Sequence, residues 1–164
     1  MDNFDIKKIL DNFSDNQIDY INKNEGLNFT TYMLSKASSN FFVRVFDKQD
    51  DALPSISVQF YISDLPSGVE KNETFLAEVC NIVNYRMDNG TTTSYIKNHE
   101  DNTFFLVIKL GIPFIDDIFK TTSDVNRGEN MLKMFLYTAL IEITNTKGYL
   151  INTILVRDSK NEDA

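Results

Sequence analysis

The stretch from Val125 to Thr146 restricts the fold of this chain more than any other segment. Ser123 or Asp124 can cap a helix that begins at Val125, because both side chains accept hydrogen bonds from free backbone N–H groups. A helix that is apolar around most of its circumference needs partners on two sides. One partner is expected to be a β-sheet, and the other is either a second copy of the chain or a cover from within the chain, namely the first helix or a long loop. The apolar side chains of this segment are Met131, Leu132, Met134, Phe135, Leu136, Tyr137, Ala139, Leu140, Ile141 and Ile143.

The rest of the chain alternates between the periods of helices and of strands. Apolar residues spaced as one helical face predict helices over residues 4–13 and 69–87, and Ser67 and Glu70 form a possible capping box for the second. Ile56, Val58, Phe60 and Ile62 alternate with Ser57, Gln59 and Tyr61, which predicts a strand. Similar patterns predict strands over 41–46, 92–97 and 103–110, and residues 17–22 and 27–34 are expected to be strands or one strand pair. Gly148 is expected to end the last helix, and residues 149–156 could form a final strand.

This order defines the expected fold class. Strands follow one another in hairpins rather than alternating strictly with helices, which indicates an α+β fold with an antiparallel sheet and helices packed on one face. The order is α-βββ-α-ββ-α. We expect a single α+β domain over residues 1–157 and a polar, disordered tail over residues 158–164.

Composition excludes several classes of protein. The chain has 164 residues with 16 Lys and Arg against 24 Asp and Glu, a net charge of −8 that disfavours a nucleic-acid or anionic-membrane surface. One Cys and one His exclude an internal disulfide and a Cys- or His-built metal site. No apolar run reaches the roughly 18 residues of a membrane span, and the N-terminus reads as mature sequence. These features predict a soluble, cytoplasmic protein.

The order of elements and some short sequence segments resemble those of one protein family. The second helix carries Cys80-Asn81-Ile82-Val83-Asn84, and a strand, a turn rich in acids and Asn, a second apolar strand, a loop and a long apolar helix follow. This resembles the YbjN family, whose fold is similar to that of the type III secretion chaperones, over most of residues 15–145. The resemblance implies a small, acidic, dimeric protein with a chaperone-like or regulatory role, and it carries over no catalytic residue. The predicted strand after Gly148 and the long loop from Asp116 to Asp124 depart from the family's pattern.

Few residues are candidates for chemistry. His99, Glu100 and Asp101 could form part of a metal site. The side chains of neighbouring turn residues point in different directions, however, so a solvent-exposed turn is the favoured interpretation. Cys80 lies on an apolar helix face and reads as a small core residue rather than as a partner of His99. Asp116, Asp117 and Asp124 could hold a hard cation, although their spacing does not match a calcium loop and Asp124 also fits a helix cap.

We therefore expect a non-enzymatic, dimeric protein-binding module without cofactor or metal. The expected partner is a protein of unknown identity, not a nucleic acid or a membrane. An acidic inhibitor or immunity protein that blocks the basic site of a nucleic-acid enzyme is an alternative, and a carboxylate enzyme using Mg²⁺ is another. The residues expected to bind the partner are Phe42, Phe46, Tyr61 and Phe105, and those expected at a dimer interface are Met131, Met134, Phe135 and Tyr137.

Overall fold

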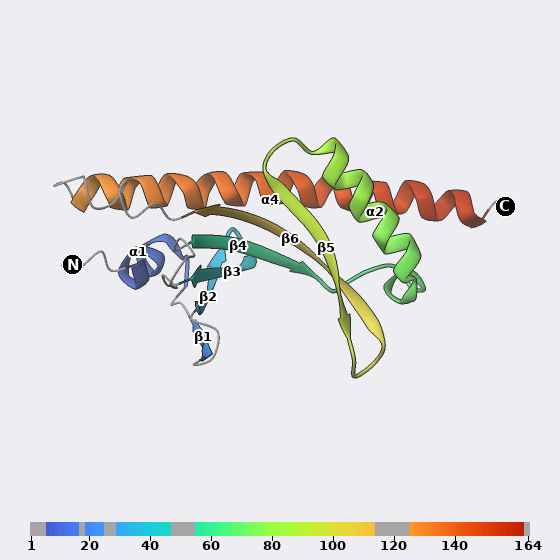
Figure 1. The fold of residues 1–164 in the computed structure, drawn as a ribbon, viewed down its shortest axis with the longest axis horizontal. Coiled ribbons are helices and arrows are strands. Elements are labelled where there is room, and N and C mark those ends of the chain that lie inside the picture. Colours follow the sequence, from blue (N-terminus) through green and yellow to red (C-terminus); the bar gives the residue numbers. More distant parts are fainter. Residues whose placement is uncertain (1–5, 17–18, 25–28, 47–54, 114–124, 163–164) are drawn as a thin grey trace. The chain divides into compact units, whose positions relative to one another are not determined.

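The computed structural model describes residues 6–16, 19–24, 29–46, 55–113 and 125–162 (Figure 1). Paired strands are antiparallel, and the hydrogen-bonded strand order is β1-β2-β3-β4-β6-β5. The predicted α+β class is confirmed, and helices and strands follow the predicted succession, with the segment 17–34 forming two strands. The elements are α1 (Ile6–Phe13), β1 (Asp19–Asn24), β2 (Phe29–Lys36), β3 (Ser39–Phe46), β4 (Ser55–Ile62), the short 3₁₀ helix η1 (Val69–Lys71), α2 (Glu73–Arg86), β5 (Thr91–Asn98), β6 (Thr103–Pro113) and α4 (Val125–Glu162).

The chain forms two compact units. The first comprises residues 1–59 and 111–140, and the second comprises residues 60–110 and 141–164. The chain passes from one unit to the other inside β4, inside β6 and inside α4. These crossing points lie within regular elements, which is why no linker composition indicates them in the sequence.

The end of α1 is fastened to the β2–β3 hairpin in the first unit. The carboxylate of Asp15 accepts hydrogen bonds from Lys36 Nζ at 2.7 Å and from the backbone N–H of Ala37 at 2.9 Å. The Lys36 hydrogen bond is the main reason that the pKa of Asp15 is lowered. Ala37 and Ser38 have φ values of 49° and 60°, as the two-residue hairpin turn requires. The buried apolar side chains of this unit are Ile9, Leu10, Phe13, Leu34, Phe41, Val43, Ile56, Val58, Leu132, Leu136 and Ala139.

The strand β4 is buried more completely than alternation predicts. Ile56 and Val58 are buried as expected, but Ser57 and Gln59, predicted for the polar face, are also buried. Gln59 Nε2 lies 3.4 Å from Ser57 Oγ, so these polar side chains interact with each other. Because β4 pairs with β3 and with β6, it is an interior strand, and such strands are often covered on both faces.

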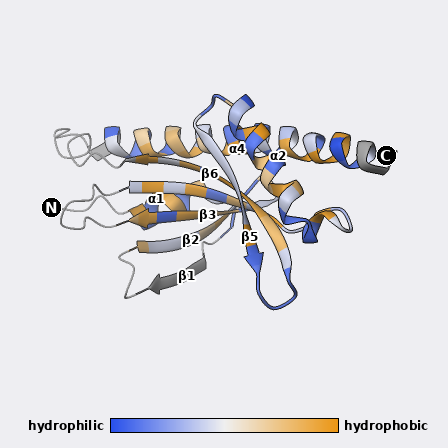
Figure 2. Ribbon diagram, turned by 45° about the vertical axis from the view of Figure 1, so that its right-hand side comes forward, coloured by the Kyte–Doolittle hydropathy of each residue, from blue (hydrophilic) through white to orange (hydrophobic). Residues whose placement is uncertain are grey.

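The second unit packs α2 and the end of α4 with the β5–β6 hairpin. Phe104, Leu106, Ile108 and Leu110 are buried, as the alternation in β6 predicts, and Val107 is buried as well. The turn between the two strands holds the hydrophilic residues 99–102 (Figure 2). The other buried apolar side chains of this unit are Ile62, Val69, Phe75, Leu76, Val79, Cys80, Val83, Ile143, Leu150 and Ile154.

The predicted end of the last helix is wrong. Gly148 does not stop α4, and the predicted strand over 149–156 is helical, as are residues 158–162 of the predicted tail. The buried positions Ile143, Thr146, Leu150 and Ile154 keep a helical spacing across the glycine. A glycine inside a helix costs about 1 kcal/mol relative to alanine. Full burial of Leu150 and Ile154 stabilises by roughly 1.5–3 kcal/mol each, so packing outweighs propensity.

Candidate functional site

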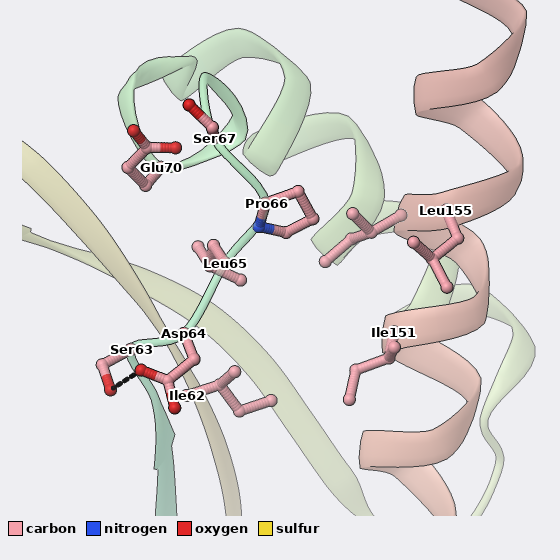
Figure 3. A pocket seen from close by; sticks show the side chains of 10 residues that line it. Ile62, Ser63, Asp64, Leu65, Pro66, Ser67, Glu70, Ile151 and Leu155 are labelled. Atoms are coloured by element: carbon pink, nitrogen blue, oxygen red, sulfur yellow. Dashed lines mark hydrogen bonds between the residues drawn. The ribbon is translucent and has the colours of Figure 1, made fainter.

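A pocket of about 740 Å³ lies in the second unit, between the segment that follows β4 and the C-terminal half of α4 (Figure 3). Ile151 and Leu155 line it from α4, and Figure 3 shows them across the pocket from Ser67 and Glu70. Leu65 lies between these two sides. The pocket thus has an apolar side on the helix and a polar side on the loop. The full lining is Ile62, Ser63, Asp64, Leu65, Pro66, Ser67, Glu70, Ile151, Ile154 and Leu155.

The loop side of the pocket has a defined backbone. The N–H of Leu65 donates to the carbonyl of Ser63 at 2.9 Å, and the N–H of Val69 donates to the carbonyl of Pro66 at 3.1 Å. Gly68 has a φ of 93°, a conformation that favours glycine. Val69 is buried and anchors this loop in the core of the unit. The turn therefore fixes the positions of the apolar and polar lining residues.

The predicted capping box of Ser67 and Glu70 is wrong. The helix α2 begins at Glu73, and Asn72 caps it by accepting a hydrogen bond from the N–H of Phe75 at 3.1 Å. Glu70 instead lies in η1. One of its carboxylate oxygens, Oε2, is buried and has no hydrogen-bond partner among the described residues. A buried carboxylate oxygen without a donor is destabilising, so Glu70 carries an uncompensated acceptor at the edge of the pocket.

Part-buried polar contacts around Asn89, and a buried contact between Thr91 and Thr146, hold the second-unit part of α4 against the start of β5. The amide of Asn89 donates to Glu142 Oε2 at 2.9 Å and to Thr146 Oγ1 at 3.2 Å. Its carbonyl oxygen accepts from the N–H of Thr91 at 3.1 Å and from Thr91 Oγ1 at 2.6 Å. The hydroxyls of Thr91 and Thr146 are 2.9 Å apart. This network fixes α4 a few turns before the pocket.

Asn84, the last residue of the helix segment quoted for the family resemblance, joins α2 to β5. Its amide donates to the carbonyl of Thr93 at 2.9 Å, and its carbonyl oxygen accepts from the N–H of Thr93 at 2.6 Å. Thr93 Oγ1 also contacts Asn84 Oδ1 at 2.9 Å and the carbonyl of Cys80 at 3.2 Å. Asn84 therefore has a structural explanation within this unit.

The four aromatic residues predicted to bind a partner are half-buried. Phe42 and Phe46 lie on β3 in the first unit, and Phe46 packs against Phe29 with ring centroids 5.2 Å apart. Tyr61 on β4 and Phe105 on β6 lie in the second unit. None of the four is among the strongly exposed apolar side chains. Their role in binding stays a prediction.

The residues predicted for a dimer interface differ in exposure. Met134 and Tyr137 are 70% and 53% exposed, Met131 is 37% exposed, and Phe135 is half-buried. Tyr137 also contacts Phe13 in an edge geometry with a centroid distance of 4.7 Å. The second-unit part of α4 exposes further apolar side chains that sequence reasoning did not select, namely Ile141, Tyr149, Ile151, Leu155 and Val156.

The candidate chemical residues do not form a reactive site in the described part of the chain. His99 and Glu100 are exposed on the β5–β6 turn, and Asp101 accepts from Thr103 Oγ1 at 2.6 Å and from its N–H at 3.0 Å. Cys80 is buried, and burial is the main cause of its raised pKa. No cluster of three potential ligands among His, Cys, Asp and Glu occurs within the described ranges. Asp116, Asp117 and Asp124 lie outside the described residues.

Comparisons with known proteins give no relative for this chain. No protein-family model, no curated protein and no solved structure matches it. Among the helices that the structure describes, none combines the length and the apolar character needed to cross a bilayer. The geometry of the pocket and of α4 therefore has to support any functional proposal.

Proposed function

We propose that this chain is a non-enzymatic protein-binding module with a chaperone-like or regulatory role, and that it holds an apolar segment of a partner protein in the pocket between residues 62–70 and α4. The observation that carries this proposal is the apolar side of the pocket. Ile151 and Leu155 are 37% and 55% exposed there although both are large aliphatic residues. A concave site lined by aliphatic side chains with a few polar groups is typical of ligand and peptide sites.

The size of the pocket and the chemistry of its lining are compatible with a peptide segment. A volume of about 740 Å³ is within the range of pockets that enclose small molecules or a few side chains. The lining provides hydroxyls and carboxylates but no His, Cys, Lys or Arg, so it offers neither a typical general base near neutral pH nor an electrophile for substrate charge. The lining is therefore best suited to bind a partner by burying the partner's apolar side chains.

A selection experiment tests this function. A phage library of random short peptides is panned against the wild-type protein, and the enriched peptides are measured by fluorescence polarisation. We expect peptides with large apolar residues whose binding falls at least about tenfold in Leu155→Asp, because a carboxylate in the pocket removes apolar contact and desolvation. Tyr85→Asp is the matched control, since Tyr85 is 86% exposed on α2 and does not line the pocket.

Salt separates this function from that of an acidic inhibitor. Contacts with an apolar pocket should persist at about 1 M salt, where the Debye length is about 3 Å, whereas a surface charge interaction should be lost. Peptides that bind Leu155→Asp as tightly as the wild type would refute the pocket as the site. Failure to enrich any peptide would refute the proposal as a whole.

We also propose that the module pairs with a second copy along α4. Gly148 lies inside the helix with no atom within 4 Å of where a Cβ would be, so nothing in its own described surroundings requires a glycine. The outward positions near it, Ile141, Thr144 and Asn145, are uncharged and exposed. In an antiparallel pair whose helices cross between Thr144 and Asn145, Ile141 of each copy lies over Gly148 of the other. The two helices then diverge before Leu155, which is one heptad after Gly148 on the same face and lines the peptide pocket. A glycine opposite a large side chain lets two helices approach closely. An interface without charged residues also avoids repulsion between two copies that each carry a net charge of −8.

A compensation experiment tests the pairing by sedimentation velocity. The wild type should be a dimer, and Gly148→Ile should shift it toward monomer because two isoleucines then collide at each such contact. Ile141→Gly should also weaken the pair by removing its apolar contact. The double variant Ile141→Gly, Gly148→Ile restores one large residue opposite one small residue and should recover dimer. A monomeric wild type, or single variants that dimerise normally, would show the pairing to be wrong.

A further inference from the structure

The polar side of the pocket indicates which kind of peptide the pocket would bind. The inference drawn from it rests on the proposed protein-binding function. We infer that the pocket binds an apolar side chain that is followed closely by a lysine or arginine, with the apolar group against α4 and the cation at Glu70. The chemical class is thus a basic amphipathic segment of a partner protein. The two groups would enter from one peptide and occupy opposite sides of the same pocket.

The first support is the state of the Glu70 carboxylate. Its Oε2 atom is buried and has no hydrogen-bond partner among the described residues, although the side chain as a whole is half-buried and lines the pocket. Because Oε2 itself is enclosed by the protein, a ligand meets Glu70 through the accessible part of its side chain. A carboxylate accepts hydrogen bonds only, so the group that meets it there must be a donor. A charged donor satisfies it best, because hydrogen bonds between ionised groups are roughly twice as strong as neutral ones.

The second support is that several cations of this unit already have other contacts. Arg157 forms an ion pair with Glu78 at 2.7 Å. Lys147 lies over the ring of Phe60 at 4.5 Å, and Lys97 lies over the ring of Phe104 at 5.8 Å. No contact of these cations with Glu70 is found in the described structure. None of these three cations therefore neutralises the Glu70 carboxylate.

The third support is the arrangement of the lining. Figure 3 shows Glu70 and Ser67 on the side opposite Ile151 and Leu155, with Asp64 at another edge of the pocket. Asp64 is exposed, and Ser63 donates a hydrogen bond to it at 3.3 Å. The polar lining therefore carries two carboxylates and no cation. Charge complementarity selects a basic group there, and the acidic chain as a whole, with a net charge of −8, favours the approach of a basic segment.

The test uses peptides selected against the full-length protein. We expect the enriched sequences to place Lys or Arg within a few residues of a large apolar residue. For one such peptide, Glu70→Gln should weaken binding at least about tenfold, because it removes a charge-assisted hydrogen bond. The same peptide with its basic residue changed to Gln should bind the wild type weakly and should not distinguish Glu70→Gln from it. Glu73→Gln is the matched control, since it removes the same charge from an exposed position outside the pocket lining.

The outcomes separate this inference from the proposed function. Peptides that depend on Leu155 but lack a basic residue, or that bind Glu70→Gln as well as the wild type, would overturn the inference and leave the protein-binding function intact. The absence of any Leu155-dependent peptide would overturn both. Equal weakening in Glu70→Gln and Glu73→Gln would indicate a general charge effect and would also overturn the inference. Thermal melting of both variants confirms that each is folded before binding is compared.

Discussion

Replacement of Asn89 by alanine should lower the free energy of unfolding by about 2–3 kcal/mol. The side chain makes four hydrogen bonds, two to Thr91 and one each to Glu142 and Thr146. The hydroxyls of Thr91 and Thr146 keep each other as partners, but the N–H of Thr91 loses its acceptor, and it cannot turn to water because Thr91 is only 6% exposed. Urea titration followed by circular dichroism measures the change in the free energy of unfolding.

Two further variants identify the cause of that loss. Asn81→Ala changes the same residue type at an exposed position of α2, and it should be neutral or stabilise by a few tenths of a kcal/mol through helix propensity. Asn89→Asp keeps the acceptor for Thr91 but places a carboxylate beside Glu142 Oε2. It should therefore destabilise most at neutral pH, and less once the pH is low enough to protonate one of the two groups. An Asn89→Ala variant within about 0.5 kcal/mol of the wild type would show that the network is not cooperative.

Local periodicity accounts for most of the elements in this fold. The helix α1, the strand β4 and the β5–β6 hairpin follow from spacing that a single segment carries, and their buried residues are largely those that the spacing selects. The burial of Gln59 does not follow from it, because β6, one of the two strands that flank β4 in the sheet, is distant in sequence. The pocket could not be predicted either. It joins residues 62–70 to residues 151–155, and only the tertiary fold brings these segments together. The apolar pair Leu65-Pro66 in an otherwise polar loop is the one local signal that could have indicated it.

The wrong prediction of where α4 ends has a different cause from the failure to predict the pocket. Gly148 and the β-branched residues after it favour a strand when each is judged by its own propensity. Leu150 and Ile154 are nevertheless spaced to continue the buried stripe that includes Ile143, and a docked helix gains from every turn of such a stripe. Tertiary burial therefore decides the structure of residues 149–156, and local preference does not.

A proline at position 153 tests that conclusion directly. Thr153→Pro should lower the free energy of unfolding by about 3 kcal/mol or more, because proline removes a helical N–H bond and clashes with the preceding turn. The change lies between the buried residues Leu150 and Ile154, so displacement of this turn also loosens their packing. Circular dichroism at 222 nm should show a loss of helix, with urea titration giving the energy.

Thr153→Ala separates the backbone effect from loss of the side chain. The threonine hydroxyl donates to the carbonyl of Tyr149 at 2.8 Å, a contact within the helix that contributes little to its stability. Alanine loses this bond but has the higher helix propensity, so the variant should stay within about 0.5 kcal/mol of the wild type. If residues 149–156 were an edge strand instead, proline would be tolerated at a position that faces solvent, and the two variants would differ little. A large gap between Thr153→Pro and Thr153→Ala is therefore what a continuous α4 requires, and the apolar side of the pocket depends on that continuity because Ile151 and Leu155 lie on the same two turns.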